Sequence, residues 1–141
     1  MIDLNKNIEE IKEFLNSSID RFQSENSIPN SIGIYCCPWS GWISINFNLN
    51  KTLTETENNC PDFEYVEFDI LDIPEWENEY ETDNPEFKLN GSIITHNHDL
   101  GDENFNQLIF DYLVPVVTEL KENYLSDFLL QILDSNLAER I

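Results

Sequence analysis

Basic residues are scarce in this chain. Its 141 residues include only 7 Lys and Arg against 28 Asp and Glu, which gives a formal net charge of −21. Binding to a nucleic-acid backbone or to an anionic membrane surface requires basic side chains, so this charge balance argues against both partners. A basic protein partner, a cation, or solubility alone remain as explanations for the excess of acid.

Long apolar runs and cysteine pairs are missing too. No stretch approaches the ~20 apolar residues of a membrane-spanning helix. The N-terminal sequence MIDLNKNIEEIKEF has early acids in place of the apolar centre of a signal peptide. Only three cysteines occur, two of them adjacent at Cys36 and Cys37, and this odd count does not suit a disulfide framework. We therefore expect a protein of the reducing cytoplasm.

The chain does contain enough apolar material for a core. Hydrophobic residues make up 40% of it and include nine Phe, five Tyr and three Trp, whereas acidic disordered chains are poor in aromatics. The length suits one domain that buries a real core. We expect a single folded unit over residues 1–141.

The first part of the chain predicts a helix followed by a β-hairpin. Apolar residues recur at helical spacing from Ile8 to Phe22, which predicts a helix over Leu4–Ser24. The run SIGIYCC at 31–37 suits a buried strand. The stretch GWISINFNLN at 41–50 alternates apolar and polar residues with the period of a strand, which places Ser44, Asn46 and Asn48 on a wetter face. The segment PWSG between the two strands has the residues of a tight turn.

The middle of the chain predicts a third strand with irregular alternation. After a loop at Lys51–Cys60, the stretch FEYVEFDI at Phe63–Ile70 is rich in strand-forming residues. Its alternation shifts phase, which indicates either two partly covered faces or a β-bulge. The segment after Pro74 is expected to be a loop or one short helical turn, because Pro85 prevents a longer helix.

The last part of the chain predicts a short strand and two helices. GSIIT at Gly91–Thr95 is the fourth strand, and a helix begins near Asp102 with a kink or break at Pro115. The apolar residues between Leu125 and Leu133 predict a final amphipathic helix. The whole order indicates an α+β domain, with a mainly antiparallel sheet of three or four strands covered by the N-terminal helix and the two C-terminal helices.

The acids concentrate in one region. Thr52–Phe87 contains thirteen of the 28 carboxylates and no Lys, Arg or His, and aromatic residues are interleaved with the acids. Trp and Tyr are enriched in binding hot spots, and clustered charge speeds the encounter with an oppositely charged partner. The alternative is a merely solvated face. We predict a partner-binding surface formed by Glu64, Glu67, Asp69, Asp72, Glu75, Trp76, Glu77, Glu79, Tyr80 and Glu81.

Two tryptophans outside this region are a second candidate. Trp39 lies in the expected hairpin turn and Trp42 directly after it. Either they are exposed aromatic contacts or they pack in the ordinary way.

Other motifs give weaker indications of chemistry. His96, His98 and Asp99, with Cys60 brought in by folding, could form a metal site or the centre of a small enzyme, but the spacing is only a fragment of such a site. The C-x-x-S pattern at Cys37–Ser40 lacks the following helix that activates a redox cysteine. The stretch after Asn97 does not fit a calcium-binding loop. We expect no enzyme, no cofactor and no metal.

Two stretches resemble immunity proteins of bacterial toxin systems, of the contact-dependent inhibition and polymorphic-toxin types. They are SIGIYCCPWSGWISINFN at Ser31–Asn48 and HDLGDENFNQLIFDYLVP at His98–Pro115. The resemblance implies a bacterial protein that neutralises a cognate toxin domain by stoichiometric binding, often a basic nuclease. A DNA mimic that binds a DNA-handling protein is an alternative function, and a structural subunit without a regulated partner is another.

Overall fold

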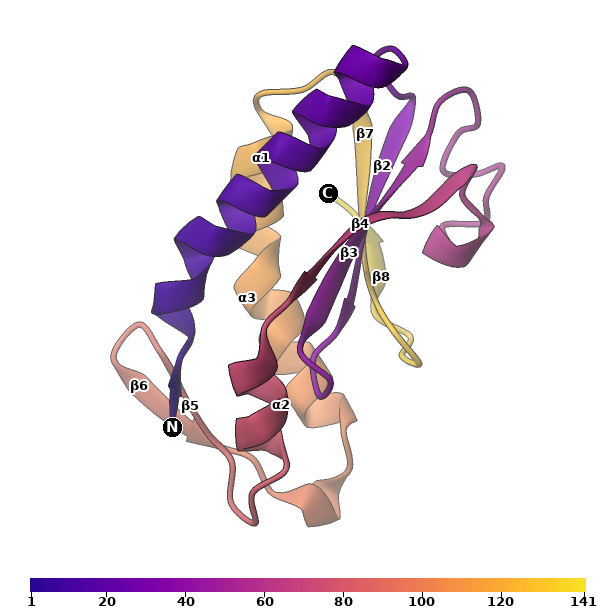
Figure 1. Ribbon diagram of the computed structural model, residues 1–141. Helices are drawn as coiled ribbons and strands as arrows, with labels where there is room; N and C mark the ends of the chain where they lie inside the picture. Colours follow the sequence, from indigo (N-terminus) through magenta and orange to yellow (C-terminus); the bar gives the residue numbers. More distant parts are fainter.

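Two β-sheets and three α-helices make up the fold in a computed structural model that describes all 141 residues (Figure 1). The helices are α1 (Ile8–Glu25), α2 (Pro74–Tyr80) and α3 (Glu103–Lys121). The strands are β1 (Ile2–Asp3), β2 (Ser31–Cys37), β3 (Trp42–Asn48), β4 (Tyr65–Asp72), β5 (Glu86–Leu89), β6 (Ser92–Thr95), β7 (Asp127–Ile132) and β8 (Ala138–Arg140). Short 3₁₀ turns precede α1, β4 and α3 at Leu4–Asn7, Cys60–Asp62 and His98–Leu100.

The larger sheet has five strands in the order β4-β3-β2-β7-β8. Its neighbours are antiparallel except for β2 and β7, which are parallel and pair Ser31 with Asp127. Helices α1 and α3 lie on one side of this sheet in Figure 1, and the loop before β4 lies on the other. A cluster of 25 buried residues fills the space between the helices and the sheets. The α+β class is therefore as the sequence predicts.

Helix α1 confirms the predicted apolar stripe. Ile11, Leu15, Ile19 and Phe22 are fully buried, and the Phe22 ring stacks on that of Phe47 with centroids 4.1 Å apart. Burying such a side chain contributes ~1.5–3 kcal/mol, so this stripe accounts for the docking of α1 on the sheet.

Helix α3 begins as predicted but does not break. It continues through Pro115, which has an exposed side chain. Proline leaves the carbonyl of Asp111 without its N–H partner, and because Asp111 is also exposed, water can bond to that carbonyl.

The C-terminal segment corrects the sequence prediction. The expected amphipathic helix between Leu125 and Leu133 is strand β7, so only one helix follows the hairpin β5–β6 and the sheet gains two strands. Phe128, Leu129 and Leu130 are successive buried residues. A strand covered on both faces is apolar at consecutive positions, and here α3 covers one face while the loop before β4 covers the other.

The polar face of β3 is also different from expectation, because it is buried. Asn46 and Asn48 are at most 1% exposed. Asn46 Oδ1 accepts from the Glu67 N–H at 2.7 Å, and Asn48 Oδ1 accepts from the Glu64 N–H at 3.0 Å. These side chains replace backbone ladder bonds where the register of β3 and β4 shifts and Glu67 adopts a φ of 51°. The irregular alternation of β4 is thus a β-bulge.

The smaller sheet has the order β1-β5-β6. Strands β5 and β6 form a hairpin around Asn90 and Gly91, with φ values of 50° and 83°. Such an Asn-Gly pair suits a two-residue hairpin turn. The predicted fourth strand is therefore β6, but it belongs to a separate sheet. None of the helices is long and apolar enough to cross a membrane.

Candidate functional site: the acidic edge of β4 and α2

Strand β4 and helix α2 follow each other along one margin of the molecule. β4 is the outer strand of the five-stranded sheet and pairs only with β3, and α2 starts two residues after it ends. The turn Pro38–Gly41 lies against the start of α2, because the Ile73 N–H donates to the Gly41 carbonyl at 2.6 Å. Gly41 has a φ of 68° and a Cβ there would clash with the Ile73 carbonyl. Glycine therefore allows the hairpin and α2 to meet.

Five of the predicted carboxylates are exposed and have neither a hydrogen bond nor an ion pair through their side chains. They are Glu67, Asp72, Glu75, Glu77 and Glu81. No cation neutralises them within the chain, so their field extends into solvent. These five are the members of the predicted set that remain free to meet a partner.

Two other predicted carboxylates hold parts of the chain together. Glu64 Oε1 accepts from the Lys51 N–H at 2.7 Å and the Asn50 N–H at 2.9 Å, and these bonds lower the pKa of Glu64. Glu79 Oε1 lies 2.8 Å from the N-terminal amine of Met1, and this contact lowers the pKa of Glu79. Both groups act as structural acceptors and not as free charges.

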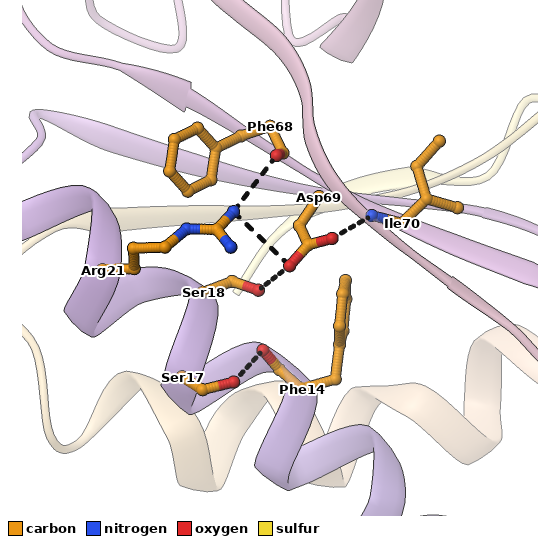
Figure 2. A network of polar contacts seen from close by, with 7 residues as sticks. All are labelled: Phe14, Ser17, Ser18, Arg21, Phe68, Asp69 and Ile70. Atoms are coloured by element: carbon orange, nitrogen blue, oxygen red, sulfur yellow. Dashed lines mark hydrogen bonds and ion pairs between the residues drawn. The ribbon is translucent and has the colours of Figure 1, made fainter.

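Asp69 is the centre of a polar network that joins β4 to α1 (Figure 2). Its Oδ2 accepts from Ser18 Oγ at 3.2 Å and lies 3.5 Å from Arg21 Nη2, and its Oδ1 accepts from the Ile70 N–H at 2.9 Å. Arg21 Nη2 also donates to the Phe68 carbonyl at 3.4 Å, and its guanidinium lies over the Phe68 ring at 4.6 Å. Two backbone groups on the free side of β4 are thus satisfied by side chains. A partner would therefore contact this edge through side chains and not through strand pairing.

The two aromatic anchors of the prediction are not free, and this is a correction. Trp76 is fully buried, with its Nε1 donating to Asn7 Oδ1 at 3.1 Å. Tyr80 is half-buried, its ring lies 5.3 Å from that of His96 and 5.0 Å from that of Phe105, and its hydroxyl bonds to Asp102. Both side chains attach α2 to the core, so neither can insert into a partner.

The sequence contains the pattern that would have revealed this. Ile73, Trp76 and Tyr80 are spaced by three and four residues, which is the apolar stripe of an amphipathic helix. The segment expected to be a loop or one turn is the two-turn helix α2, and its glutamates lie on the outer side because its aromatic side chains fill the inner one.

Other apolar groups are exposed among the free acids. On β4, Val66 is 47% exposed and Ile70 is 44% exposed, and in the turn beside α2 Trp39 is 39% exposed. Trp42 is half-buried and lies opposite Asp72 on the neighbouring strand, with its ring 5.8 Å from that of Tyr35. We call this surface the acidic edge, and define it by Trp39, Val66, Glu67, Ile70, Asp72, Glu75, Glu77 and Glu81.

The alternative site around the histidines is not assembled with Cys60. His96 and His98 lie with ring centroids 5.1 Å apart, and His98 Nε2 lies 2.9 Å from the Thr82 carbonyl. Cys60 is buried on the far face of the larger sheet, in a cluster with Leu53, and burial raises its pKa. No group of three or more His, Cys, Asp and Glu side chains is arranged to hold a metal ion.

The adjacent cysteines are buried as well. Cys36 and Cys37 are unpaired thiols inside the sheet, and burial raises the pKa of both. A raised pKa keeps the thiol protonated, whereas a redox cysteine needs a lowered one. The C-x-x-S pattern is therefore a structural part of the hairpin.

Comparisons with known proteins add no assignment. No family model matches the sequence, and no curated protein and no solved structure is significantly similar to it.

Proposed function

We propose that this is a non-enzymatic binding protein whose acidic edge covers a basic protein partner. The observation that supports this function is that β4, α2 and the turn beside α2 carry five exposed, unpaired carboxylates together with the exposed apolar side chains of Trp39, Val66 and Ile70. The acids supply long-range attraction and the apolar groups supply contact area that excludes water.

Binding proceeds in two stages. The net charge of −21 attracts a cationic partner at a distance, so the association rate falls as salt screens the field. Burial of Trp39, Val66 and Ile70 then slows dissociation, because apolar contacts at the centre of an interface act mainly on the off-rate. In this account Trp39, Val66 and Ile70 supply the apolar contacts that the sequence alone assigns to Trp76 and Tyr80.

The biological setting that we propose is toxin immunity in a bacterial cytoplasm. A basic nuclease domain holds phosphates with Lys and Arg, and the free carboxylates of the acidic edge would stand where those phosphates bind. The protein would block its toxin in a one-to-one complex without changing it covalently. The resemblance of the β2–β3 hairpin region to immunity proteins supports the same setting.

The test first asks whether a gene beside that of this protein encodes a basic toxin domain, and it uses that domain as the binding partner. The double variant Glu75→Lys/Glu77→Lys reverses two free charges on α2. The control Glu13→Lys/Glu122→Lys makes the same change in net charge at exposed positions, one within α1 and one directly after α3. We expect the α2 variant to associate severalfold more slowly at low salt, and the control to differ much less. Equal association rates for the two variants would refute binding at the acidic edge.

A second pair of variants tests how much the exposed apolar side chains slow dissociation. Trp39→Ala should raise the dissociation rate about tenfold or more, the range of an interface hot spot. Leu125→Ala, at a side chain that is 86% exposed in the loop before β7, should leave this rate unchanged. If both substitutions are neutral, Trp39 is not part of the interface.

A further inference from the structure

We propose that the free edge of β6 is a self-association surface that pairs with β6 of a second copy of this chain. The four outer strands of the two sheets differ in how they are protected from pairing. Exposed strand edges expose unpaired N–H and C=O groups, and natural proteins block them with charges, bulges, covering side chains or short length.

Three of the four edges are blocked. β4 has a bulge at Glu67 and the contacts of Arg21 and Asp69 described above. β8 is three residues long, and its Arg140 donates to Asn58 Oδ1 at 3.0 Å and to Thr54 Oγ1 at 2.6 Å. β1 has only two residues. None of them offers a straight, unoccupied strand.

The β6 edge is also short, but it has no charge, no bulge and no covering side chain. Its four residues Ser92–Thr95 are exposed and uncharged, and no Asp or Glu occurs between Phe87 and His98. Figure 1 shows the β5–β6 hairpin at the lower left, with no element beyond β6. Ile93 is 57% exposed and Ile94 is 36% exposed. Leu100, which is 67% exposed, lines a small pocket of about 100 Å³ together with Ile94.

The hydrogen-bond pattern identifies the backbone groups that are free. The His96 N–H donates to the Pro85 carbonyl at 2.8 Å, and β5 pairs with β6 in the register Phe87–Ile94. Since the bonding residues of an antiparallel strand alternate, His96 and Ile94 face β5, and Ile93 and Thr95 face outward. The N–H and C=O groups of Ile93 and Thr95 have no partner in the chain.

This edge is complementary to itself. In an antiparallel pair related by a two-fold axis, Ile93 of one copy lies opposite Thr95 of the other. On each strand the N–H and C=O groups of these two residues point outward. They form hydrogen bonds across both Ile93–Thr95 pairs. The axis passes between the two Ile94 side chains, which become a cross-strand apolar pair. Leu100 lies beside Ile94 and would be covered by the same contact.

Charge favours a second copy over a basic partner at this place. A cationic protein is attracted to the acidic edge, whereas β6 offers it no carboxylate and β5 offers only the half-buried Glu86. Two copies that each carry −21 repel each other, and the hairpin is the exposed strand pair where repulsion is locally weakest. A four-residue edge is too short to bury the roughly 1,200 Å² of a stable interface. The dimer is therefore weak and is strengthened by salt.

Sedimentation equilibrium over a range of concentrations, at about 0.02 M and about 0.5 M NaCl, tests this proposal. We expect a monomer at low salt and a monomer–dimer equilibrium at high salt. Ile94→Lys places two like charges at the axis, and Thr95→Pro removes an outward N–H that β5 does not use. Each should raise the dimer dissociation constant about tenfold or more. Leu125→Lys makes the same charge change on a distant exposed side chain and should leave the equilibrium as in the wild type.

Two results would overturn the proposal. One is a wild-type chain that stays monomeric at high salt and the highest soluble concentration. The other is a dimer that persists in both β6 variants while circular dichroism shows that they are folded. Binding to a basic partner weakens with salt and self-association strengthens with it, so either idea can fail without the other.

Discussion

Arg21 Nη2 lies 3.5 Å from Asp69 Oδ2 and connects the second half of α1 to the outer strand of the larger sheet. The same guanidinium covers the Phe68 ring and bonds to the Phe68 carbonyl, so a single cation makes three different contacts. The chain has 7 Lys and Arg in all. Arg21 therefore neutralises one carboxylate within the region that is richest in acids.

Arg21→Ala should lower the free energy of unfolding by about 0.5–1.5 kcal/mol, since the ion pair is half exposed and the cation–π contact adds to it. Urea denaturation measures this change. Lys51→Ala removes the same charge from an exposed side chain that makes no hydrogen bond or ion pair. It should be neutral within about 0.5 kcal/mol. If Lys51→Ala lowered the free energy of unfolding as much as Arg21→Ala does, the loss would come from net charge and not from the contacts of Arg21.

Trp76→Phe should be destabilising by roughly 1–3 kcal/mol, because it leaves the buried Asn7 amide oxygen without its donor and opens a small cavity. Thermal unfolding followed by circular dichroism is a suitable measurement. Trp39→Phe provides the matched substitution at an exposed ring and should change stability little. Should the two variants melt alike, Trp76 would not be the internal anchor of α2.

Gly33→Ala should destabilise the protein by roughly 1–3 kcal/mol through overpacking. A Cβ at this position in β2 would lie 2.6 Å from Cys60 Sγ and 2.9 Å from the Phe63 ring. The substitution should cost less in a Cys60→Ala background, because the smaller side chain makes room. Chemical denaturation measures both changes in the free energy of unfolding. An equal loss in the two backgrounds would argue against a contact between this Cβ and Cys60.

His96 should make stability depend on pH. Burial, with His98 second, lowers the pKa of His96 from its ordinary 6.5, and Tyr80, His98 and Phe105 pack around the ring while Asp102 bonds to Tyr80. The unfolded chain therefore binds a proton that the folded state does not, and this contribution lowers the free energy of unfolding as the pH falls below about 6.5.

The measurement compares wild type with His96→Phe at about pH 7.5 and about pH 5.5. The many carboxylates titrate in both proteins, so only the difference between the two reports His96. We expect His96→Phe to be relatively more stable at the lower pH. An identical pH dependence would contradict the lowered pKa.

Periodicity predicted those elements whose apolar residues all lie on one face. Helix α1 has apolar residues at helical spacing with glutamates between them, and β3 has apolar and polar residues in strict alternation. Each element therefore shows a single period in the sequence. The phase shift in β4 was visible as well, and the register shift opposite Asn46 explains it. These elements account for the predicted class and for the β2–β3 hairpin.

Strand β7 could not be identified in this way. Its successive residues Phe128 to Leu130 are apolar on both faces because α3 and the loop before β4 cover the strand. Such a short apolar run has no period that separates a strand from a helix. The candidate site was predicted in part for a similar reason. Charge identified which segment is exposed, whereas the burial of Trp76 depends on the packing of α2 against Asn7, far away in the sequence.

The parallel pairing of Ser31 with Asp127 has a consequence for synthesis. The middle strand of the larger sheet acquires its second neighbour only after the residues up to Ile132 have left the ribosome, and contacts so distant in sequence slow folding. Until then the β2–β3 hairpin has an unpaired apolar edge. We infer that the density of negative charge also keeps the unfinished chain in solution during this interval.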